Sequence, residues 1–495
     1  MSAGTAALVA VLALPAGGAL AAACLRRDRA ARILATAVAA LTLAAAALLG
    51  RPGPPPPAGP PVWHDLDLPW VPALDLRLHL AVDGISYPLV LLTALLTLLC
   101  CAHLCWRPPA SGGRLLAALL LLVELGAVGT FLAWDLLLFF CFFEVVLLPM
   151  YAVIAFWGGP GRRRAARLFA VYTLTGSVLL LVGVLTVVVA AGTGDLSVLT
   201  GGAGLGRGAQ YAAFALLALA FAVKAPLWPL HTWLPAAHTE APTVGSVLLA
   251  GVLLKLGTYG LVRVAVGVAP QAAAEFRGVL AALATAAILV GTLVCLAQSE
   301  LKRLVAYSSV AHMGFVLLGV ATLTETGLHA ALLGNVAHGV VTGLLFFLVG
   351  AVKDGAGTGE LAALGGLRER FPALAGVLGF AAVASLGLPG LAGFWGEAFA
   401  VVAAWQVGGA YWSTLGALAA VGGALAAASF LRMLRLVSHG PAGTAVAAMP
   451  RPAAAHWWSW APLVGLTLLL GVLPALVLTP GHAPLRYLLI PFTGE

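Results

Sequence analysis

Apolar residues occupy long, unbroken stretches of this chain and do not alternate with polar residues as they do in the strands of an outer-membrane barrel. A helix needs about 17 to 25 such residues to cross a bilayer. Fourteen stretches of this kind are found, near residues 5–24, 33–50, 84–105, 114–131, 135–157, 168–191, 211–232, 243–264, 276–297, 303–321, 327–350, 372–404, 410–431 and 461–479. The pattern predicts an all-α polytopic membrane protein with about fourteen transmembrane helices.

Two of the predicted spans are interrupted. The seventh contains Pro226 and Pro229, and the twelfth contains Gly387-Leu388-Pro389-Gly390 and is too long for one straight crossing. Interruptions five spans apart indicate repeats, and a repeat with an odd number of helices must insert upside down relative to its partner. We therefore expect two inverted five-helix repeats, spans 4–8 and 9–13. The predicted organisation is helices 1–3 with a Pro-rich external loop in 1–110, the first repeat in 111–265, the second in 266–435, and a cytoplasmic loop with helix 14 in 436–495.

Composition agrees with a bilayer environment. Of 495 residues, 62% are hydrophobic and only 9% are charged, and the mean hydropathy is +1.04. Soluble domains carry about 25% charged residues, so this chain could not cover a water-exposed globule. The lipid bilayer is therefore an expected partner. Nucleic acid is not, although the formal net charge is +8.

The basic residues explain that net charge as an orientation signal, because Lys and Arg concentrate in cytoplasmic loops. The loops after odd-numbered spans hold eighteen of them: Arg26, Arg27, Arg29, Arg32, Arg107, Arg114, Arg162, Arg163, Arg164, Arg167, Lys302, Arg303, Lys353, Arg368, Arg370, Arg432, Arg435 and Arg451. The opposite side holds six: Arg51, Arg77, Arg207, Arg263, Arg277 and Arg486. We expect an inner (plasma) membrane protein with both termini outside.

Motifs for bound cofactors are missing from the sequence. The six cysteines lie in or beside predicted spans without metal-ligand spacing, and no glycine-rich dinucleotide or phosphate loop is found. We expect neither a cofactor nor a metal in this chain.

Several ionisable residues fall inside the predicted spans, where each costs roughly 2.5 to 3.5 kcal/mol on insertion scales. They are Glu124 in the fourth span, Glu144 in the fifth, Lys224 in the seventh, Lys255 in the eighth, His312 in the tenth, His338 in the eleventh and Glu397 in the twelfth. Snorkelling to water or a static ion pair is the alternative to a functional role. Snorkelling does not suit Lys255, which has roughly ten apolar residues on each side.

The positions of these residues suggest an alternating acid and base row through the membrane midplane. Pro226 cannot bond to the carbonyl of Ala222, and freed carbonyls at membrane depth survive where a wet cavity or protein covers them. Opening or closing a Glu144–Lys224 pair would switch Lys224 between holding and releasing a proton. Hydroxyl groups of Ser308, Ser309 and Thr342 lie one helical turn from His312 or His338 and are candidate bridges. The row predicts proton movement.

Motifs around these residues resemble a known family, the M subunits of bacterial NADH-quinone oxidoreductase, respiratory complex I. The resemblance covers spans 4–13 and rests on Phe143-Glu144-Val145, Leu148-Pro149-Met150-Tyr151, Phe221-Ala222-Val223-Lys224-Ala225-Pro226, Pro229-Leu230-His231-Thr232-Trp233-Leu234-Pro235, Ala237-His238-Thr239-Glu240-Ala241-Pro242-Thr243, Leu301-Lys302-Arg303-Leu304, Ala306-Tyr307-Ser308-Ser309 and His312-Met313-Gly314. The string from His231 to Pro235 is shared with the family's L subunit. The string from Ala237 to Thr243 is specific to M.

The resemblance implies a proton-pumping membrane-arm subunit, related to subunits of multisubunit sodium/proton antiporters and located in the bacterial inner membrane. It implies that Glu144, Lys224, Lys255 and Glu397 translocate protons, with His312 and His338 along the same row. NADH, FMN, iron–sulfur clusters and quinone are then expected on partner subunits, and the other membrane-arm subunits, including the L-type and N-type ones, are expected partners. One departure from the family pattern is Ala236, where the family usually has Asp.

Two other functions remain open on the sequence. A subunit of a multisubunit cation/proton antiporter would carry the same Glu and Lys row. A structural spacer subunit would carry the buried charges as static pairs between adjacent helices.

Overall fold

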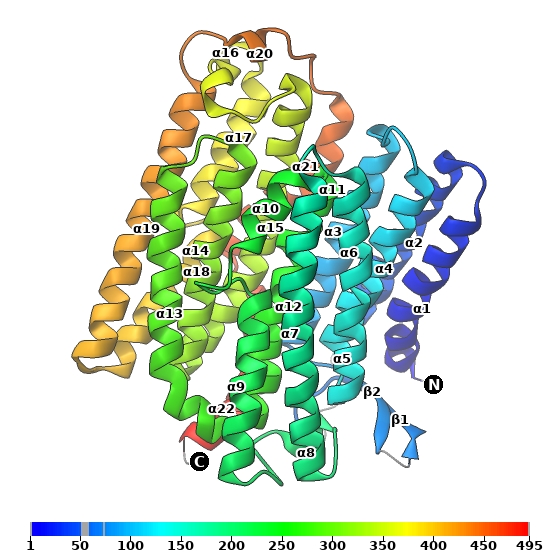
Figure 1. Ribbon diagram of the computed structural model, residues 1–495, viewed down its shortest axis with the longest axis vertical. Coiled ribbons are helices and arrows are strands. Elements are labelled where there is room, and N and C mark those ends of the chain that lie inside the picture. The colour runs from blue at the N-terminus through cyan, green and yellow to red at the C-terminus, as the bar shows by residue number, and fades with distance from the viewer. Residues whose placement is uncertain (1, 51–58, 73–74, 494–495) are drawn as a thin grey trace.

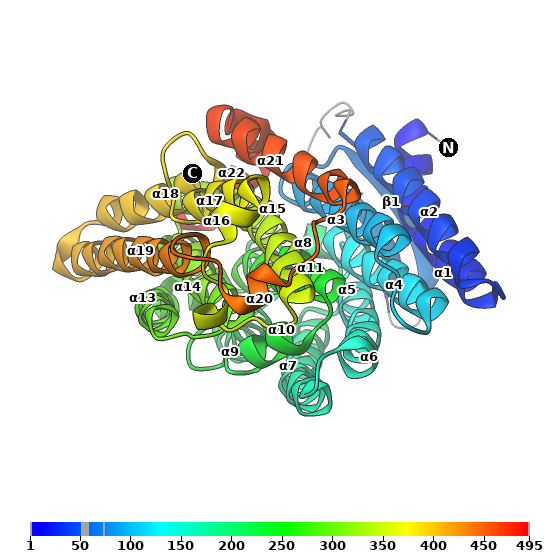
Figure 2. The same ribbon diagram turned by 90° about the horizontal axis from the view of Figure 1, so that it is seen from above.

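Long helices run roughly parallel to the vertical axis of Figure 1, in a computed structural model that describes residues 2–50, 59–72 and 75–493. Each apolar run of the sequence forms helix because a backbone in lipid must satisfy its own hydrogen bonds. The first four helices lie side by side at one edge of the bundle (Figure 2). They are α1 (Ala3–Cys24), α2 (Asp28–Leu48), α3 (Ser86–Trp106) and α4 (Gly113–Leu132).

The middle of the chain forms the part of the bundle that carries most of the buried charges. Its first helices are α5 (Leu136–Val145), α6 (Leu147–Trp157), α7 (Arg162–Ala191), α8 (Leu196–Leu199), α9 (Arg207–Lys224), α10 (Trp233–Glu240), α11 (Thr243–Leu248), the π-helical η2 (Leu249–Leu253), α12 (Leu254–Gly260) and the π-helical η3 (Leu261–Val266). The chain continues with α13 (Pro270–Leu296), α14 (Leu301–Thr322), α15 (Glu325–Ala356), the short η4 (Leu361–Ala363), α16 (Leu367–Arg370), α17 (Pro372–Ser385), α18 (Ala392–Val407) and α19 (Gly409–Ser438). Helix α15 lies inside the bundle (Figure 2), and 94% of its most apolar stretch is buried.

The C-terminal segment contains two helices where the sequence predicted one. After α20 (Thr444–Ala447) and η5 (Ala454–His456), helix α21 (Trp457–Val472) is followed by α22 (Ala475–Thr493). The two helices are bent by 64° at the break between them. Leu473 is followed by Pro474, and the residue before a proline is pushed out of helical geometry, which explains the break.

Helices occupy all fourteen positions where spans were predicted. Among the described residues, eleven helices are long and apolar enough to cross a membrane, or twelve if the bent pair at the C-terminus counts as one span. Both predicted interruptions break a helix: in the seventh span α9 ends at Lys224 and the next helix, α10, begins only beyond the predicted span, and the twelfth span is divided into α17 and α18. The count of fourteen, the inverted repeat and the domain boundaries stay predictions.

A β-hairpin, which was not predicted, precedes α3. Strands β1 (His64–Val71) and β2 (Leu76–Val82) pair antiparallel, with His64 opposite Val82 and Leu66 opposite Leu80. Leucines alternate with polar residues in both strands, so a period-two signal was present in a segment read only as an external loop. Most of the expected Pro-rich linker lies in 51–58, outside the described residues.

Both ends of the chain lie at the same end of the bundle as the hairpin, whereas α16 and α20 lie at the opposite end (Figure 1). An even number of crossings requires this arrangement. The two ends of the bundle are called the hairpin end and the α16 end below.

Candidate functional site

Lys255 lies at the centre of the buried polar residues. It is on α12, a short α-helical segment between the π-helical segments η2 and η3, and its side chain is 1% exposed. A π-helical turn leaves backbone carbonyls without their usual partner and is frequent at functional sites. The Lys255 Nζ donates to the carbonyl oxygen of Ala250 in η2 at 2.6 Å. The irregular helix thus supplies one of the partners of the buried ammonium group.

His338 supplies the other partner. Its Nδ1 lies 2.6 Å from the Lys255 Nζ, although the two residues are 83 positions apart in the chain. Next to this contact, the Thr258 hydroxyl donates to the Oδ1 of Asn335 at 2.7 Å and so links α12 to α15 a second time. The structure therefore joins two of the residues that the sequence singled out.

His312 and Glu397 extend this row across the bundle. The rings of His312 and His338 lie 5.7 Å apart, edge to face, and the His312 Nε2 lies 3.4 Å from a carboxylate oxygen of Glu397. The same nitrogen lies 2.9 Å from the carbonyl oxygen of Ser385, the last residue of α17. The break between α17 and α18 frees this carbonyl, so the predicted interruption contributes directly to the site.

A cavity of about 30 Å³ lies beside these four residues. His312, His338, Ser385 and Glu397 line it, together with Thr342. The His338 Nε2 and the hydroxyls of Thr342 and Ser385 are buried and have no protein partner. A cavity of this size with several polar atoms has room for a water molecule or two. Of the predicted bridging hydroxyls, Thr342 faces the cavity, whereas Ser308 and Ser309 bond to the carbonyl oxygen of Val305 in their own helix.

Lys224 and Glu144 are neighbours, but the structure does not join them in a direct ion pair. The Ser177 hydroxyl donates a very short hydrogen bond to a carboxylate oxygen of Glu144. The Lys224 Nζ lies 4.8 Å from the centre of the Phe143 ring, a cation–π contact. Phe143 precedes Glu144 in α5, so one helix presents an aromatic face and a carboxylate toward Lys224.

The proline break after Lys224 is closed more fully than the sequence suggested. Helix α9 ends at Lys224, and the carbonyl oxygen of Ala222 accepts from the Leu227 N–H at 2.9 Å. The indole of Trp233 donates to the carbonyl oxygen of Val223 at 3.0 Å. Protein groups therefore satisfy both carbonyls, including that of Ala222, which was expected to attract water.

Glu124 stands apart from the row. It is fully buried in α4, and neither of its carboxylate oxygens has a hydrogen-bond partner in the protein. Cys101 of α3 is close enough to interact with it electrostatically. The structure does not bring Glu124 into contact with the other six residues.

A buried ion pair was missed because Arg263 was assigned to an external loop. Its guanidinium group makes a very short contact with Asp83, and the two side chains are 2% and 0% exposed. The centre of the Trp134 ring lies 4.9 Å from the guanidinium carbon. Arg263 lies in the helical segment η3 and not in a loop. An Arg at the end of an apolar run looks the same in sequence whether it reaches water or a buried partner.

His238 is a second buried residue that was not predicted to be a site residue, although it lies in the motif from Ala237 to Thr243. It is fully buried, stacks on Phe346 at 4.4 Å, and neither ring nitrogen has a partner. The charges of Lys255 and Lys302 both act on it. The residues that follow it, Thr239 to Ala241, line a cavity of about 700 Å³ that also contains Lys302 and Lys353. His238 is therefore adjacent both to a large polar cavity and to the central Lys255.

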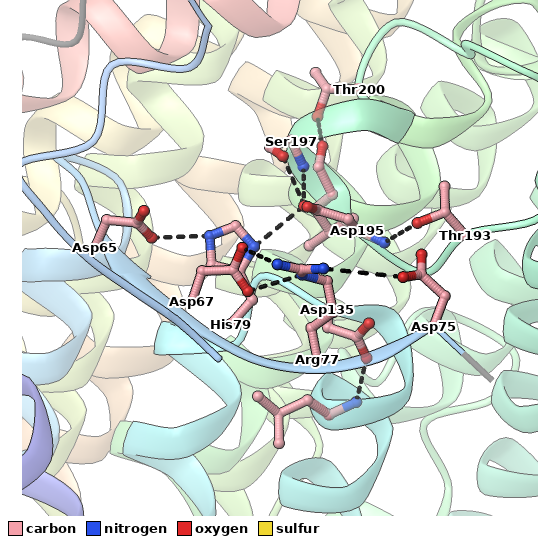
Figure 3. A network of polar contacts seen from close by, with 12 residues as sticks. Asp65, Asp67, Asp75, Arg77, His79, Asp135, Thr193, Asp195, Ser197 and Thr200 are labelled. Carbon is pink, nitrogen blue, oxygen red and sulfur yellow. Dashed lines mark hydrogen bonds and ion pairs between the residues drawn. The ribbon is translucent and has the colours of Figure 1, made fainter. Parts of the chain in front are cut away.

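The hairpin carries a polar network at the hairpin end of the bundle, and Figure 3 shows this network from close by. His79 lies between two carboxylates, with its Nε2 2.8 Å from Asp65 and its Nδ1 3.2 Å from Asp195 in the segment before α8. Arg77 makes two hydrogen bonds to Asp67, at 2.8 and 2.6 Å. Burial lowers the pKa of His79, but hydrogen bonds to Asp195 and Asp65 and their charges outweigh it and raise that pKa to about 9. The network attaches the hairpin to the segment beside the start of α5.

This attachment is expected to depend on pH. Because the pKa of His79 is raised from its ordinary 6.5 to about 9, its stabilising effect is fully present below 6.5 and is lost as the pH rises through about 9. Hydrogen–deuterium exchange of the β1 and β2 amides, corrected for intrinsic rates, should show protection that falls near pH 9. The His79→Gln variant should be less protected at pH 7 and should show no such fall. An identical pH profile in both proteins would contradict the assignment.

Comparison with known proteins gives similarity over most of the region of spans 4–13, where the sequence motifs lie. A family profile described as NADH:quinone oxidoreductase/Mrp antiporter, transmembrane, matches residues 133–422. NADH-quinone oxidoreductase subunit M of Rhodobacter capsulatus is 39% identical over 435 residues, which are 85% of this chain and 83% of that protein. NAD(P)H-quinone oxidoreductase chain 4 1 of Synechococcus sp. (strain JA-3-3Ab) is 45% identical over 379 residues, 75% of this chain and 71% of that protein.

Two solved structures share the fold. A chain of respiratory complex I from Thermus thermophilus, solved with bound NADH, superimposes with a TM-score of 0.86 at 31% identity, covering 97% of this chain and 99% of that one. A chain of the Mrp complex from Dietzia sp. DQ12-45-1b superimposes with a TM-score of 0.88 at 25% identity, covering 100% of this chain and 99% of that one. The similarity therefore extends beyond the family match to nearly the whole chain.

Proposed function

The chain belongs to the NADH:quinone oxidoreductase/Mrp antiporter transmembrane family, and from that membership we infer that it is a proton-translocating membrane subunit of an NADH-quinone oxidoreductase. The relatives named subunit M and the similar chain in respiratory complex I support this function. In this proposal NADH, FMN, iron–sulfur clusters and quinone are handled by partner subunits. The other membrane-arm subunits, including the L-type and N-type ones, are its neighbours.

The observation that carries the proposal is the connected row Lys255–His338–His312–Glu397 with its cavity. The 2.6 Å contact between Lys255 and His338 needs one donor and one acceptor. When Lys255 is an ammonium group, the His338 Nδ1 accepts, and the neutral ring carries its own proton on Nε2. That nitrogen has no protein partner and its ring lines the cavity. His338 can therefore receive a proton on its Nδ1 and release another from its Nε2, on the opposite side of the ring.

One transfer proceeds as follows. Lys255 gives its proton to the His338 Nδ1 and becomes a neutral amine, while the His338 Nε2 releases its proton to water in the cavity. His312 or the Glu397 carboxylate takes that proton, since the two are 3.4 Å apart. Lys255 must then be protonated again, and a second positive charge beside it would oppose this. Clearing the proton toward Glu397 removes that opposition. Before the next cycle the His338 proton must also return from Nδ1 to Nε2, by rotation of the ring or by exchange with water in the cavity, so that Nδ1 can again accept from the Lys255 ammonium group.

Lys224 and Glu144 serve in this proposal as the switch that responds to the neighbouring subunits. Glu144 is held by Ser177 and attracts the Lys224 ammonium without contacting it. A small movement of α5 would bring the two charges together or separate them, and the field at Lys255 would change with it. The cavity of about 700 Å³ lined by the residues that follow His238 is the proposed uptake route. Ala236 offers no carboxylate on this side, where the resemblance to the M subunits leads one to expect Asp.

The basic residues give this route a direction. They concentrate in the loops at the α16 end, which we place on the cytoplasmic side of a bacterial inner membrane, with both termini outside. The polar cavity beside Lys302 and Lys353 then faces the cytoplasm. Glu397 is the residue from which protons leave toward the outside.

A second candidate function is a subunit of a multisubunit cation/proton antiporter. The similarity to a chain of an Mrp complex, with a TM-score of 0.88 over the whole chain, favours it. Purification of the tagged chain from its native membrane separates the two functions. We expect flavin and iron–sulfur subunits to copurify and NADH to drive proton movement in proteoliposomes. Copurification without redox subunits, together with cation-dependent proton movement that needs no NADH, would favour the antiporter.

A further inference from the structure

A second group of titratable side chains lies away from the row, where α15 begins and α22 passes it. Glu325 is the first residue of α15, His329 is one turn further along, and His482 is on α22. A carboxylate oxygen of Glu325 lies 2.9 Å from the His482 Nδ1 and 4.0 Å from the His329 Nδ1. The two imidazole rings are nearly parallel, with centres 5.9 Å apart. Two histidines and one glutamate thus converge from two helices.

These residues have the chemistry and spacing of a transition-metal site. One ligand atom from each lies within 4.8 Å of the other two. A tetrahedral Zn²⁺ ion takes His nitrogen and Glu oxygen ligands at about 2.0–2.2 Å, which places ligand atoms about 3.4 Å apart. The ligand atoms now lie up to 4.8 Å apart, so side-chain rotations must bring the most distant pair closer by about 1.4 Å. Glu325 and His329 share one helix face because they are four residues apart.

The exposure of the group and an uncommitted ring nitrogen also suit a metal. His329 Nε2 is buried and has no hydrogen-bond partner among the residues that the structure describes, so this ring nitrogen is uncommitted. The side chains of Glu325 and His482 are 45% and 50% exposed, so an ion can arrive from water. The start of a helix carries partial positive charge, which opposes a cation. The ionised Glu325 at that position offsets this opposition.

The backbone that carries His482 is held firmly against its surroundings. A Cβ atom on Gly481 would lie 2.5 Å from the Leu332 side chain of α15, and one on Gly84 would lie 1.7 Å from the carbonyl oxygen of Pro480. Helix α22 is therefore packed closely against both α15 and the turn before α3 at this point. Only side chains need to move for the three ligands to meet.

Asp67, His79 and Asp195 form another group with ligand atoms at metal spacing. This group is less suited to binding a metal ion. Arg77 already binds Asp67, and the protonated His79 is itself the cation between two carboxylates. A metal ion there would have to displace the arginine and deprotonate the histidine. That network is complete without a metal.

We propose that Glu325, His329 and His482 bind one Zn²⁺ ion, with water as the fourth ligand, at the hairpin end of the bundle. Three protein ligands with an open position are a known arrangement for zinc. The ion joins the terminal helix α22 to α15, nine residues before His338 on the same helix. It therefore fixes α22 to the helix that carries His338.

Zinc titration of the purified complex in detergent tests the proposal. We expect the wild-type complex to bind one more equivalent of Zn²⁺ tightly than the His482→Ala complex, by isothermal titration calorimetry after removal of metals by chelation. Co²⁺ in place of Zn²⁺ should give visible absorption bands of a nitrogen- and oxygen-coordinated ion, and these should be lost in His482→Ala and Glu325→Gln. His482 is half exposed, so its replacement leaves the buried core unchanged.

The matched control is His439→Ala, which removes an exposed histidine after α19. It should keep the equivalent of Zn²⁺ and the Co²⁺ bands. Equal zinc binding by wild type and His482→Ala would overturn the proposal, as would the absence of tight binding in the wild type. NADH-driven proton movement by the metal-free complex is tested separately, so failure of the zinc site leaves the proposed function standing.

Discussion

The Lys255→Met complex is expected to reduce quinone with NADH at least about tenfold more slowly than the wild type, and to translocate protons correspondingly slowly, because a positioned acid or base contributes about 10²–10⁴-fold to a proton transfer. Methionine has nearly the same length and suits the buried surroundings, so the helix should keep its packing. It cannot donate to the Ala250 carbonyl or share a proton with His338. His338 then loses the lysine ammonium group that would give it a proton.

The measurement is NADH oxidation and proton uptake by proteoliposomes that contain the intact complex. Arg435→Met is a matched control, because it replaces an exposed basic residue in the last turn of α19 that lines neither the cavity of the row nor the proposed uptake cavity. The amount of assembled complex should be equal in both variants. If Lys255→Met assembles and works at the wild-type rate, the buried charges are static pairs and the spacer function gains support.

The Arg263→Met variant is expected to destabilise the protein by about 3–5 kcal/mol, the usual cost of removing one partner of a buried ion pair. Its partner Asp83 would remain buried and charged, with only the backbone N–H groups of Ile85 and Ser86, each at 3.0 Å, to stabilise it. The cost should be evident as a lower thermal unfolding midpoint in detergent and as less assembled complex. This pair joins η3 to the start of α3 across 180 residues of sequence.

The double variant Asp83→Asn and Arg263→Met should recover most of that loss. Asparagine keeps an oxygen for the two backbone donors but leaves no uncompensated charge, and replacing both partners of a buried pair is often nearly neutral. A double variant as unstable as Arg263→Met alone would show that the arginine stabilises the fold through Trp134 and Tyr259 and not through Asp83.

The sequence was sufficient for the helices and for their interruptions, since both depend on local properties. Runs of apolar residues predict helices in lipid, and Pro226 and Pro389 lie just after the ends of α9 and α17. The alternation in β1 and β2 was also local but short, and it was overlooked within a loop. The bend between α21 and α22 is caused by Pro474, but a single span was predicted there.

The site was predictable only as a set of unusual residues. Burial of a charge is expensive wherever it occurs, so Lys255, His338 and Glu397 were conspicuous without any structure. Their connections were not, because Lys255 meets His338 through tertiary packing. The same holds for Arg263, whose partner Asp83 precedes another helix. The π-helical segments around Lys255 could not be predicted from the apolar pattern. Every residue of that span is buried, so the span has no polar face whose spacing would indicate a change in helix type.

In the proposed function, protons pass along a connected row from Lys255 to Glu397 through His338. Simultaneous recording of proton uptake and NADH oxidation by proteoliposomes that contain the His338→Leu complex tests it most directly, because both charged residues remain while the link between them is removed. The predicted result is proton uptake at least about tenfold below that of the wild type. Proton uptake at the wild-type rate, with the same number of protons for each NADH oxidised, would contradict the claim.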